Sequence, residues 1–243
     1  MLSTSVKGKI NSIQSLGTLD GPGIRFVLFL QGCNLRCSCC HNPDTWDLKS
    51  GYEADAEEIL SKVLRYKAYF SDEGGITVSG GEPLLQAEFT KELFALCKAN
   101  DINTCLDTSG SILNDKITEL LSVTDRVLLD IKYTDNEHYE KYVGCGMSAP
   151  LLFLDKLEEL GIPTVLRQVI IPSLNDNTDN IKHLADLVNS HKCVEKAELL
   201  AFKKICKVKY DNLGIDFPFE SFDTPSKESM LCLQNELDNI IAR

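Results

Sequence analysis

The sequence predicts an α/β fold, built as an open or partial barrel of parallel strands. Segments typical of buried strands alternate with segments of helical periodicity, and this unit repeats six times. Polar residues follow the strand ends, where the active sites of parallel β/α folds lie. The chain has 243 residues, a length at which such a fold forms one domain around one core.

The expected elements follow from short apolar runs and from helical spacing of apolar residues. The expected strands are residues 10–14, 24–30, 75–79, 103–107, 126–131, 164–170 and 196–201. The expected helices are residues 54–69, 86–99, 115–121, 137–142 or 153–160, 177–190 and 227–242. Strand–helix alternation implies right-handed crossovers and strands buried on both faces. Periodicity does not give strand order, so a doubly wound open sheet is the alternative.

Composition excludes several classes of function. A formal net charge of -11 disfavours nucleic acid, because backbone binding needs basic surface. No apolar run approaches a membrane span, and residues 1–7 lack the apolar core of a signal peptide. We therefore expect a cytoplasmic protein. In that reducing compartment, clustered thiols indicate metal or redox chemistry instead of disulfides.

Residues 33–41 hold four of the ten cysteines, directly after an expected strand. In one interpretation Cys33, Cys37 and Cys40 bind a [4Fe–4S] cluster and leave its fourth iron open. In a second, three thiolates and His41 close a zinc site. A third, haem attachment at a C-x-x-C-H pattern, leaves Cys33 unexplained. A structural zinc usually stabilises a small module that cannot build a hydrophobic core. This chain is long enough to have such a core, so the iron–sulfur interpretation is favoured. The other cysteines are expected to be structural: Cys97, Cys105, Cys145, Cys193, Cys206 and Cys232.

Other strand ends also carry polar groups or glycine. These are Ser79, Gly80, Gly81, Glu82, Asp107, Thr108, Asp130, Lys132, Arg167, Lys203 and Lys204. Each has a simpler interpretation. Gly80 and Gly81 could form a plain turn before a helix that starts at Pro83, and Asp107 and Thr108 could cap a helix. The glycine-rich residues 17–23 could approach a ligand or serve only as a connector.

The order and spacing of these motifs resemble the radical S-adenosylmethionine (SAM) superfamily. The resemblance rests on Cys33-x-x-x-Cys37-x-x-Cys40 followed by Gly80-Gly81-Glu82. Further segments resemble the glycyl radical enzyme activases, of the kind that activates pyruvate formate-lyase: residues 20–25, 31–33, 40–42, 44–46, 104–108 and 129–132. The resemblance implies a partial (β/α)6, TIM-like barrel in one domain over residues 1–243. The cluster and most SAM contacts would lie in residues 17–132.

The implied reaction is reductive cleavage of SAM to methionine and a 5′-deoxyadenosyl radical, which takes hydrogen from a glycine Cα of a partner enzyme. Cys33, Cys37 and Cys40 would hold the cluster. SAM would contact Cys39, His41, Ser79, Gly80, Gly81, Glu82, Asp130, Ile131, Lys132, Arg167 and Lys203. A monovalent cation could bind Asp107, Thr108, Leu128 and Asp130, and the substrate glycine loop would dock at Asp20.

The chain also departs from the family pattern. Ala201, Phe202 and Lys203 stand where the family usually has Pro-Tyr-His, Cys39 replaces a common aromatic residue, and residues 206–209 differ. No cysteine lies between Cys40 and Gly80, so one cluster is expected, which favours the pyruvate formate-lyase type. The implied partners are a glycyl radical enzyme and a flavodoxin or ferredoxin electron donor. The alternatives are a radical SAM enzyme with a small-molecule substrate and a zinc-stapled interaction protein.

Overall fold

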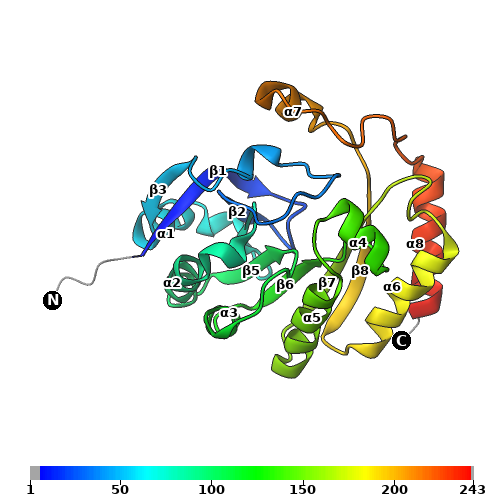
Figure 1. The fold of residues 1–243 in the computed structure, drawn as a ribbon. Coiled ribbons are helices and arrows are strands. Elements are labelled where there is room, and N and C mark those ends of the chain that lie inside the picture. Colours follow the sequence, from blue (N-terminus) through cyan, green and yellow to red (C-terminus); the bar gives the residue numbers. More distant parts are fainter. Residues whose placement is uncertain (1–5, 242–243) are drawn as a thin grey trace. The chain divides into compact units, whose positions relative to one another are not determined.

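Eight strands form one open sheet in the computed structural model, which describes residues 6–241 (Figure 1). The strand order is β3-β1-β2-β4-β5-β6-β7-β8. From β2 onward the order never reverses, whereas a doubly wound sheet reverses at its switch point. The predicted open α/β barrel is therefore confirmed and the doubly wound alternative is wrong.

The chain divides into two compact units. The first comprises the described part of Met1–Asn34, then Thr45–Thr108 and Ile112–Leu128. The second comprises Leu35–Asp44, Ser109–Ser111 and the described part of Leu129–Arg243. The strand β6 (Arg126–Asp130) has residues in both.

The strands of the first unit mix two directions. They are β1 (Lys7–Gly17), β2 (Arg25–Leu30), β3 (Tyr52–Asp55), β4 (Gly75–Gly80) and β5 (Asn103–Thr108). β1 pairs antiparallel with both β2 and β3, while β2, β4 and β5 are parallel. Neither β3 nor the antiparallel edge was predicted. Leu30 pairs with Gly80, so the chain leaves β2 and β4 at the same level.

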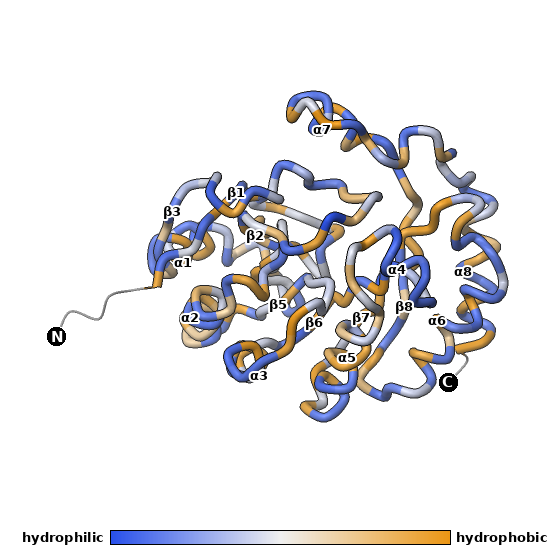
Figure 2. Tube along the Cα trace, viewed as in Figure 1, coloured by the Kyte–Doolittle hydropathy of each residue, from blue (hydrophilic) through white to orange (hydrophobic). Residues whose placement is uncertain are grey.

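Three helices cover this sheet: α1 (Ala56–Leu64), α2 (Ala87–Lys98) and α3 (Asp115–Leu121). α1 packs on α2, and α2 packs on α3. Hydrophobic and hydrophilic residues alternate along α2 and α3, as amphipathic helices require (Figure 2). The helix predicted over 54–69 is shorter at both ends. A capping box of Asp55 and Glu58 starts α1 at Ala56, and α1 ends at Leu64, before a separate 3-10 helix, Lys67–Tyr69.

The second unit is built on β7 (Thr164–Ile170) and β8 (Val194–Ala201), which pair in parallel. Its helices are α4 (Asn136–Tyr142), α5 (Ser148–Leu160), α6 (Thr178–Ser190), α7 (Lys207–Leu213) and α8 (Lys227–Ile241). Both helical stretches offered as alternatives, 137–142 and 153–160, form helices. α7 was not predicted, and residue 242 of the predicted last helix lies outside the described residues. α6 and α8 pack on each other and on β8.

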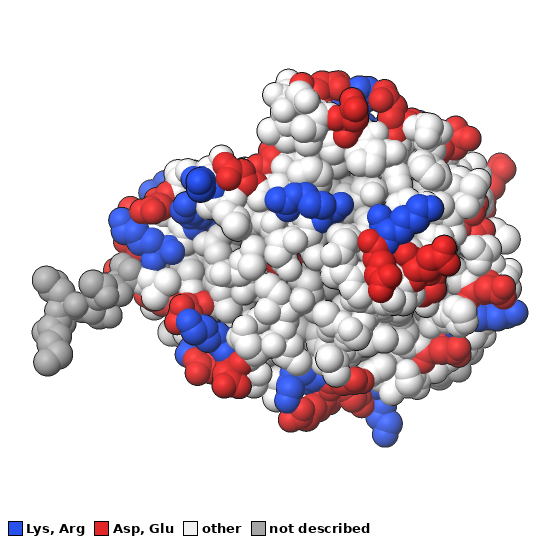
Figure 3. Space-filling model, in the orientation of Figure 1, with Lys and Arg blue, Asp and Glu red and all other residues white. Residues whose placement is uncertain are grey.

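Within residues 6–241, no helix has the length and apolar character needed to cross a bilayer. Acidic and basic side chains are interspersed on the face drawn in Figure 3. That pattern, together with the net charge of -11, gives no support to a phosphate-backbone partner.

Candidate functional site

In the first unit, the Gly80-Gly81-Glu82 turn lies against the chain that leads into Cys33. Gly81 N donates to Leu30 O at 2.9 Å, and Glu82 N donates to Gly32 O at 2.9 Å. A Cβ on Gly81 would lie 2.1 Å from Gly32 O, and one on Gly80, where φ is +113°, would lie 2.3 Å from Leu30 N. Glycine is therefore required at both positions by backbone contact.

Polar side chains at the ends of β4 and β5 bind one another. Ser79 Oγ donates to Asp107 Oδ2 at 2.7 Å, and Thr108 Oγ1 donates to Glu82 Oε1 at 2.6 Å. Glu82 also accepts from Leu84 N at 3.1 Å, as the cap of the short 3-10 helix Pro83–Gln86. The turn thus does start a helix at Pro83, as the simpler interpretation had it. The Ser79–Asp107 bond joins β4 to β5, and the Thr108–Glu82 bond joins β5 to the turn after β4. The helix that follows β5 is α3, and its cap is Asn114.

In the second unit, Asp130 joins the two basic side chains predicted to face the SAM carboxylate. Its Oδ2 lies 2.6 Å from Lys132 Nζ and its Oδ1 lies 3.1 Å from Arg167 Nε. Burial raises the pKa of Asp130, but the charges of Lys132 and Arg167 outweigh it and lower that pKa. Burial lowers the pKa of Lys132, yet Asp130 and the thiolates of Cys37 and Cys39 hold it well above its usual value.

The cysteine loop, residues 35–44, is held by backbone bonds to the end of α4. Arg36 N donates to Val143 O at 3.3 Å, and Ser38 N donates to Tyr142 O at 2.8 Å. Cys40 N donates to Cys37 O at 3.0 Å, which closes the loop into a turn. These bonds fix the backbone on which Cys37 and Cys40 are placed.

Cys40 is held from two further sides. Asn42 N donates to its Sγ at 3.4 Å, and the Tyr210 hydroxyl of α7 donates to its carbonyl at 3.2 Å. Lys209, also on α7, reaches Asn42 and Asp44 at 2.9 Å each. The unpredicted α7 thus has a defined task, because it holds the end of the cysteine loop.

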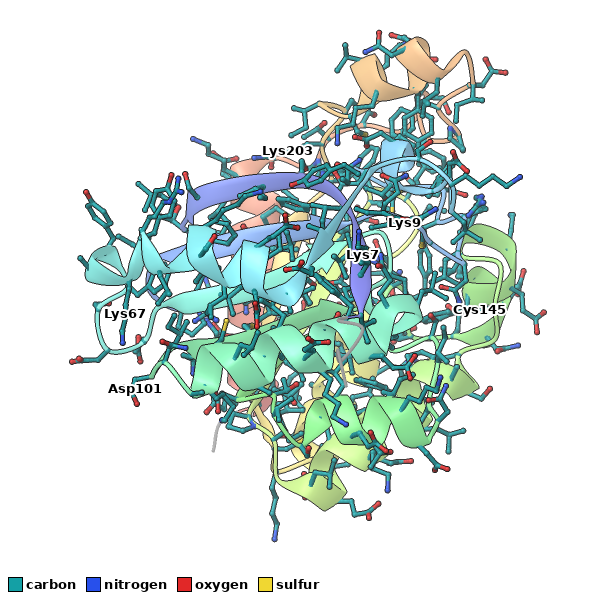
Figure 4. The ribbon with its side chains drawn as sticks, turned by 90° about the vertical axis from the view of Figure 1, so that its left-hand side faces the viewer. Lys7, Lys9, Lys67, Asp101, Cys145 and Lys203 are labelled. Carbon is teal, nitrogen blue, oxygen red and sulfur yellow. The ribbon has the colours of Figure 1, made fainter. Side chains whose placement is uncertain are left out.

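His41 contacts Lys203, the residue that departs from the family pattern, through the backbone. Its Nε2 donates to Lys203 O at 3.0 Å. Lys203, labelled in Figure 4, lies just after the end of β8. Burial lowers the pKa of His41, and the charges of Lys132, Lys209 and Lys203 act in the same direction. His41 is therefore a neutral imidazole here. Cys39 is buried, and burial raises the pKa of its thiol.

Of the remaining predicted residues, Asp20 and Leu128 lie in the first unit, and Ile131, buried directly after β6, lies in the second. The carbonyl of Asp20 accepts from Thr77 Oγ1 at 2.6 Å, and Leu128 is a buried residue of β6. Cys33 belongs to the first unit, and Cys37 and Cys40 belong to the second. Over residues 6–241, no three His, Cys, Asp or Glu side chains form a group that could hold a metal ion.

The donor chemistry of the loop fits an iron–sulfur cluster. Such clusters are bound by thiolates, and hydrogen bonds to sulfur together with nearby charge tune them. The Cys40 sulfur already accepts an N–H, and Lys132 places positive charge beside Cys37. The cysteines of this loop and the groups around them therefore fit an iron–sulfur cluster.

Comparison with known proteins agrees with this chemistry. Residues 27–187 match the Radical SAM superfamily. A pyruvate formate-lyase-activating enzyme of Clostridium pasteurianum is 44% identical over 237 residues, 97% of this chain and 99% of that protein. One from Staphylococcus epidermidis is 41% identical over 233 residues, 93% of each. The chain belongs to the radical SAM superfamily, among the pyruvate formate-lyase-activating enzymes. As a radical SAM enzyme, it works with a [4Fe–4S] cluster and SAM.

Solved radical SAM structures share the fold at lower identity. A domain of a pyruvate-formate lyase-activating enzyme from Bacteroides vulgatus superposes with a TM-score of 0.57 at 23% identity, over 69% of this chain and 94% of that one. Streptococcus suis SuiB bound to S-adenosylmethionine gives 0.59 at 16% identity, over 71% and 39%. At sequence identities this low, the two structures show a shared fold and nothing further about this radical SAM enzyme.

Several residues that organise the site were not found from the sequence. The Tyr139 hydroxyl accepts Lys132 N at 3.0 Å, and the Tyr210 hydroxyl donates to Cys40 O of the cysteine loop. Ser38, within that loop, donates its amide to Tyr142 O. Ser38 acts through its backbone, which no side-chain pattern reveals. Tyr139 carries one available signal: aromatic residues with a polar tip recur in 133–142, directly after a strand end with charged groups.

Proposed function

We propose that the chain activates a glycyl radical enzyme, pyruvate formate-lyase, by removing a hydrogen atom from a glycine Cα of that enzyme. The observation that carries the proposal is the 44% identity, over nearly the full length of both proteins, to a protein of that name. The cysteine spacing supports it, because one cluster loop occurs without a second cysteine-rich insertion.

In this proposal Cys33, Cys37 and Cys40 hold the cluster. When bound, the cluster supplies an electron that cleaves SAM into methionine and a 5′-deoxyadenosyl radical. Asp130 orients Lys132 and Arg167 toward the anionic SAM carboxylate, which matches their charge. The protein's part is to place SAM and to exclude competing reactions.

The remaining SAM contacts are assigned by the same reasoning. Gly80 and Gly81 let backbone approach the methionine amino group, with Ser79 and Glu82 as polar neighbours. Cys39, His41, Ile131 and Lys203 complete the SAM pocket in this proposal. A monovalent cation binds Asp107, Thr108, Leu128 and Asp130, whose oxygens are hard ligands. Asp20 receives the glycine loop of the partner.

A flavodoxin or ferredoxin serves as electron donor in this proposal, and the protein acts in the cytoplasm. None of the ten cysteines, all within residues 6–241, forms a disulfide, and this is compatible with a reducing compartment. The complex with the glycyl radical enzyme is transient in this proposal, because the partner must expose a normally buried segment to the activase.

The decisive experiment is electron paramagnetic resonance (EPR) spectroscopy under anaerobic conditions. The reconstituted, reduced protein is mixed with SAM and with pyruvate formate-lyase from the same organism, and a glycyl radical doublet is expected. Cys37→Ala should abolish the doublet, while Cys232→Ala, at an exposed thiol of α8, should leave it unchanged. Formation of 5′-deoxyadenosine without any glycyl radical would instead support a small-molecule substrate. Stoichiometric zinc without sulfide in the purified protein would support the alternative of a zinc-stapled interaction protein.

A further inference from the structure

Tyr133 carries a buried hydroxyl that its surroundings leave unsatisfied. The side chain is 2% exposed, and within residues 6–241 its Oη has no hydrogen-bond partner. A buried phenol without a partner costs free energy, so such groups are rare in native proteins. The radical SAM mechanism described above gives Tyr133 no role.

The ring of Tyr133 is held rigidly in an aromatic cluster of the second unit. It stacks on His138 with ring centroids 5.5 Å apart and an interplanar angle of 29°. Tyr142 lies 5.7 Å away and Tyr139 packs edge-on at 6.4 Å. Because its neighbours fix the ring, the hydroxyl points in a defined direction.

That aromatic cluster is bonded to the cysteine loop. Tyr142 O accepts the amide of Ser38, which stands between Cys37 and Cys39. Tyr139 Oη accepts the amide of Lys132, the residue before Tyr133. The Tyr133 pKa is raised, first by burial and then by electrostatic interaction with Cys39 and Cys37. The hydroxyl therefore keeps its proton and lies within electrostatic reach of both sulfurs.

We propose that the Tyr133 hydroxyl is a hydrogen-bond donor to sulfur at the Cys37 side of the iron–sulfur cluster, and that it raises the cluster's reduction potential. An O–H directed at sulfur withdraws negative charge, and this stabilises the reduced cluster more than the oxidised one. Tyr133 is then a positioning residue for electron transfer, and binding of the cluster satisfies its hydroxyl. The inference rests on the proposed function, because it requires the cluster on this loop.

The first test is a redox titration of the reconstituted protein, followed by the EPR signal of the reduced cluster. Tyr133→Phe removes the hydroxyl and keeps the ring. Tyr142→Phe is the matched control, because it removes a hydroxyl of the same aromatic cluster that pairs with Lys141. We expect Tyr133→Phe to lower the equilibrium constant for reduction about tenfold, about 59 mV for one electron, with Tyr142→Phe like wild type. Equal potentials in the two variants would overturn the inference.

The second test compares thermal unfolding with and without the cluster. Without the cluster, Tyr133→Phe should be at least as stable as wild type, since it removes an unsatisfied hydroxyl. With the cluster, the same variant should unfold at a lower temperature than wild type. An identical shift in both forms would mean that the hydroxyl has a purely structural role and would contradict the inference. If the wild-type protein assembles no cluster at all, the proposed function fails instead, so the two failures are distinguishable.

Discussion

At the scale of single residues, Gly81 shows how the Gly80-Gly81-Glu82 turn depends on the absence of a side chain. A Cβ at this position would lie 2.1 Å from Gly32 O and 3.3 Å from Cys33 N, so the backbone that leads to Cys33 would have to move. We expect Gly81→Ala to lower the free energy of unfolding by about 1–3 kcal/mol and to reduce the iron retained after reconstitution. Urea unfolding and iron analysis measure the two effects.

Gly146→Ala is the matched control for that substitution. The nearest atoms to a Cβ there are Asn136 Oδ1 at 3.4 Å and Ser148 Oγ at 3.7 Å, which is ordinary contact. Its effect should stay within about 0.5 kcal/mol. If both alanines behaved alike, the close approach of Gly81 to the backbone of Gly32 and Cys33 would not matter for stability or iron retention.

Asp130 gives a prediction for pH dependence. Its folded pKa lies below the unfolded value of 3.8, so its contribution to stability is present above about pH 4 and is lost as the pH falls through the folded pKa. We expect Asp130→Asn to cost about 3 kcal/mol at neutral pH, because Lys132 and Arg167 lose their shared carboxylate. The difference from wild type should shrink in acid unfolding titrations below pH 4. The exposed Asp216→Asn should show no such difference, and a pH-independent gap for Asp130→Asn would contradict the assignment.

At the scale of elements, the end of α4 holds the cysteine loop in place through backbone hydrogen bonds. Ser38→Pro removes the amide that donates to Tyr142 O, while Ser38→Ala keeps it. We expect the proline variant to lose about 1–3 kcal/mol of loop stability and to retain less iron after gel filtration. Its far-UV circular dichroism should stay unchanged, since Ser38 lies outside the helices and strands. Equal iron in both variants would show that this bond does not position the cysteines.

The elements also show where sequence reasoning works and where it stops. The periodicity of 115–121 and 164–170 located α3 and β7 to the residue, because each has one buried face or a continuous buried run. β3 was missed because Tyr52–Asp55 is short and mostly exposed, so it has no apolar signature. α7 was missed because its main anchors, Tyr210 and Lys209, bind the cysteine loop far away in the sequence.

Sequence reasoning also did not reveal the structural role of a buried charged side chain, Arg25. Arg25 is fully buried at the start of β2, where its guanidinium donates to Thr77, to Asn103 and to the carbonyl of Glu73. These partners come from other strands and loops, 48 to 78 residues away. The motif containing Arg25 was found from the sequence, but its role in joining β2, β4 and β5 depends on tertiary pairing.

At the scale of the whole molecule, the cysteines include three proposed cluster ligands, buried unreactive thiols and the exposed Cys232. Burial raises the pKa of Cys97 to about 12 and that of Cys193 to about 11, so at pH 8 both are almost entirely protonated and unreactive. Cys232 is exposed on α8. The protein should therefore bind one cluster, with about four iron and four sulfide per chain.

Alkylation with iodoacetamide, read by peptide mass spectrometry, tests this division in the folded protein. Cys232 should react in every form, whereas Cys97 and Cys193 should react only after unfolding. Cys33, Cys37 and Cys40 should be modified in the cluster-free protein and become protected once iron and sulfide are bound. The protection pattern reports the ligands directly, without any assay of activity. If Cys145 or Cys206 were protected in place of one of these three, the proposed ligand set would be wrong. About eight iron per chain would equally contradict the proposal of a single cluster.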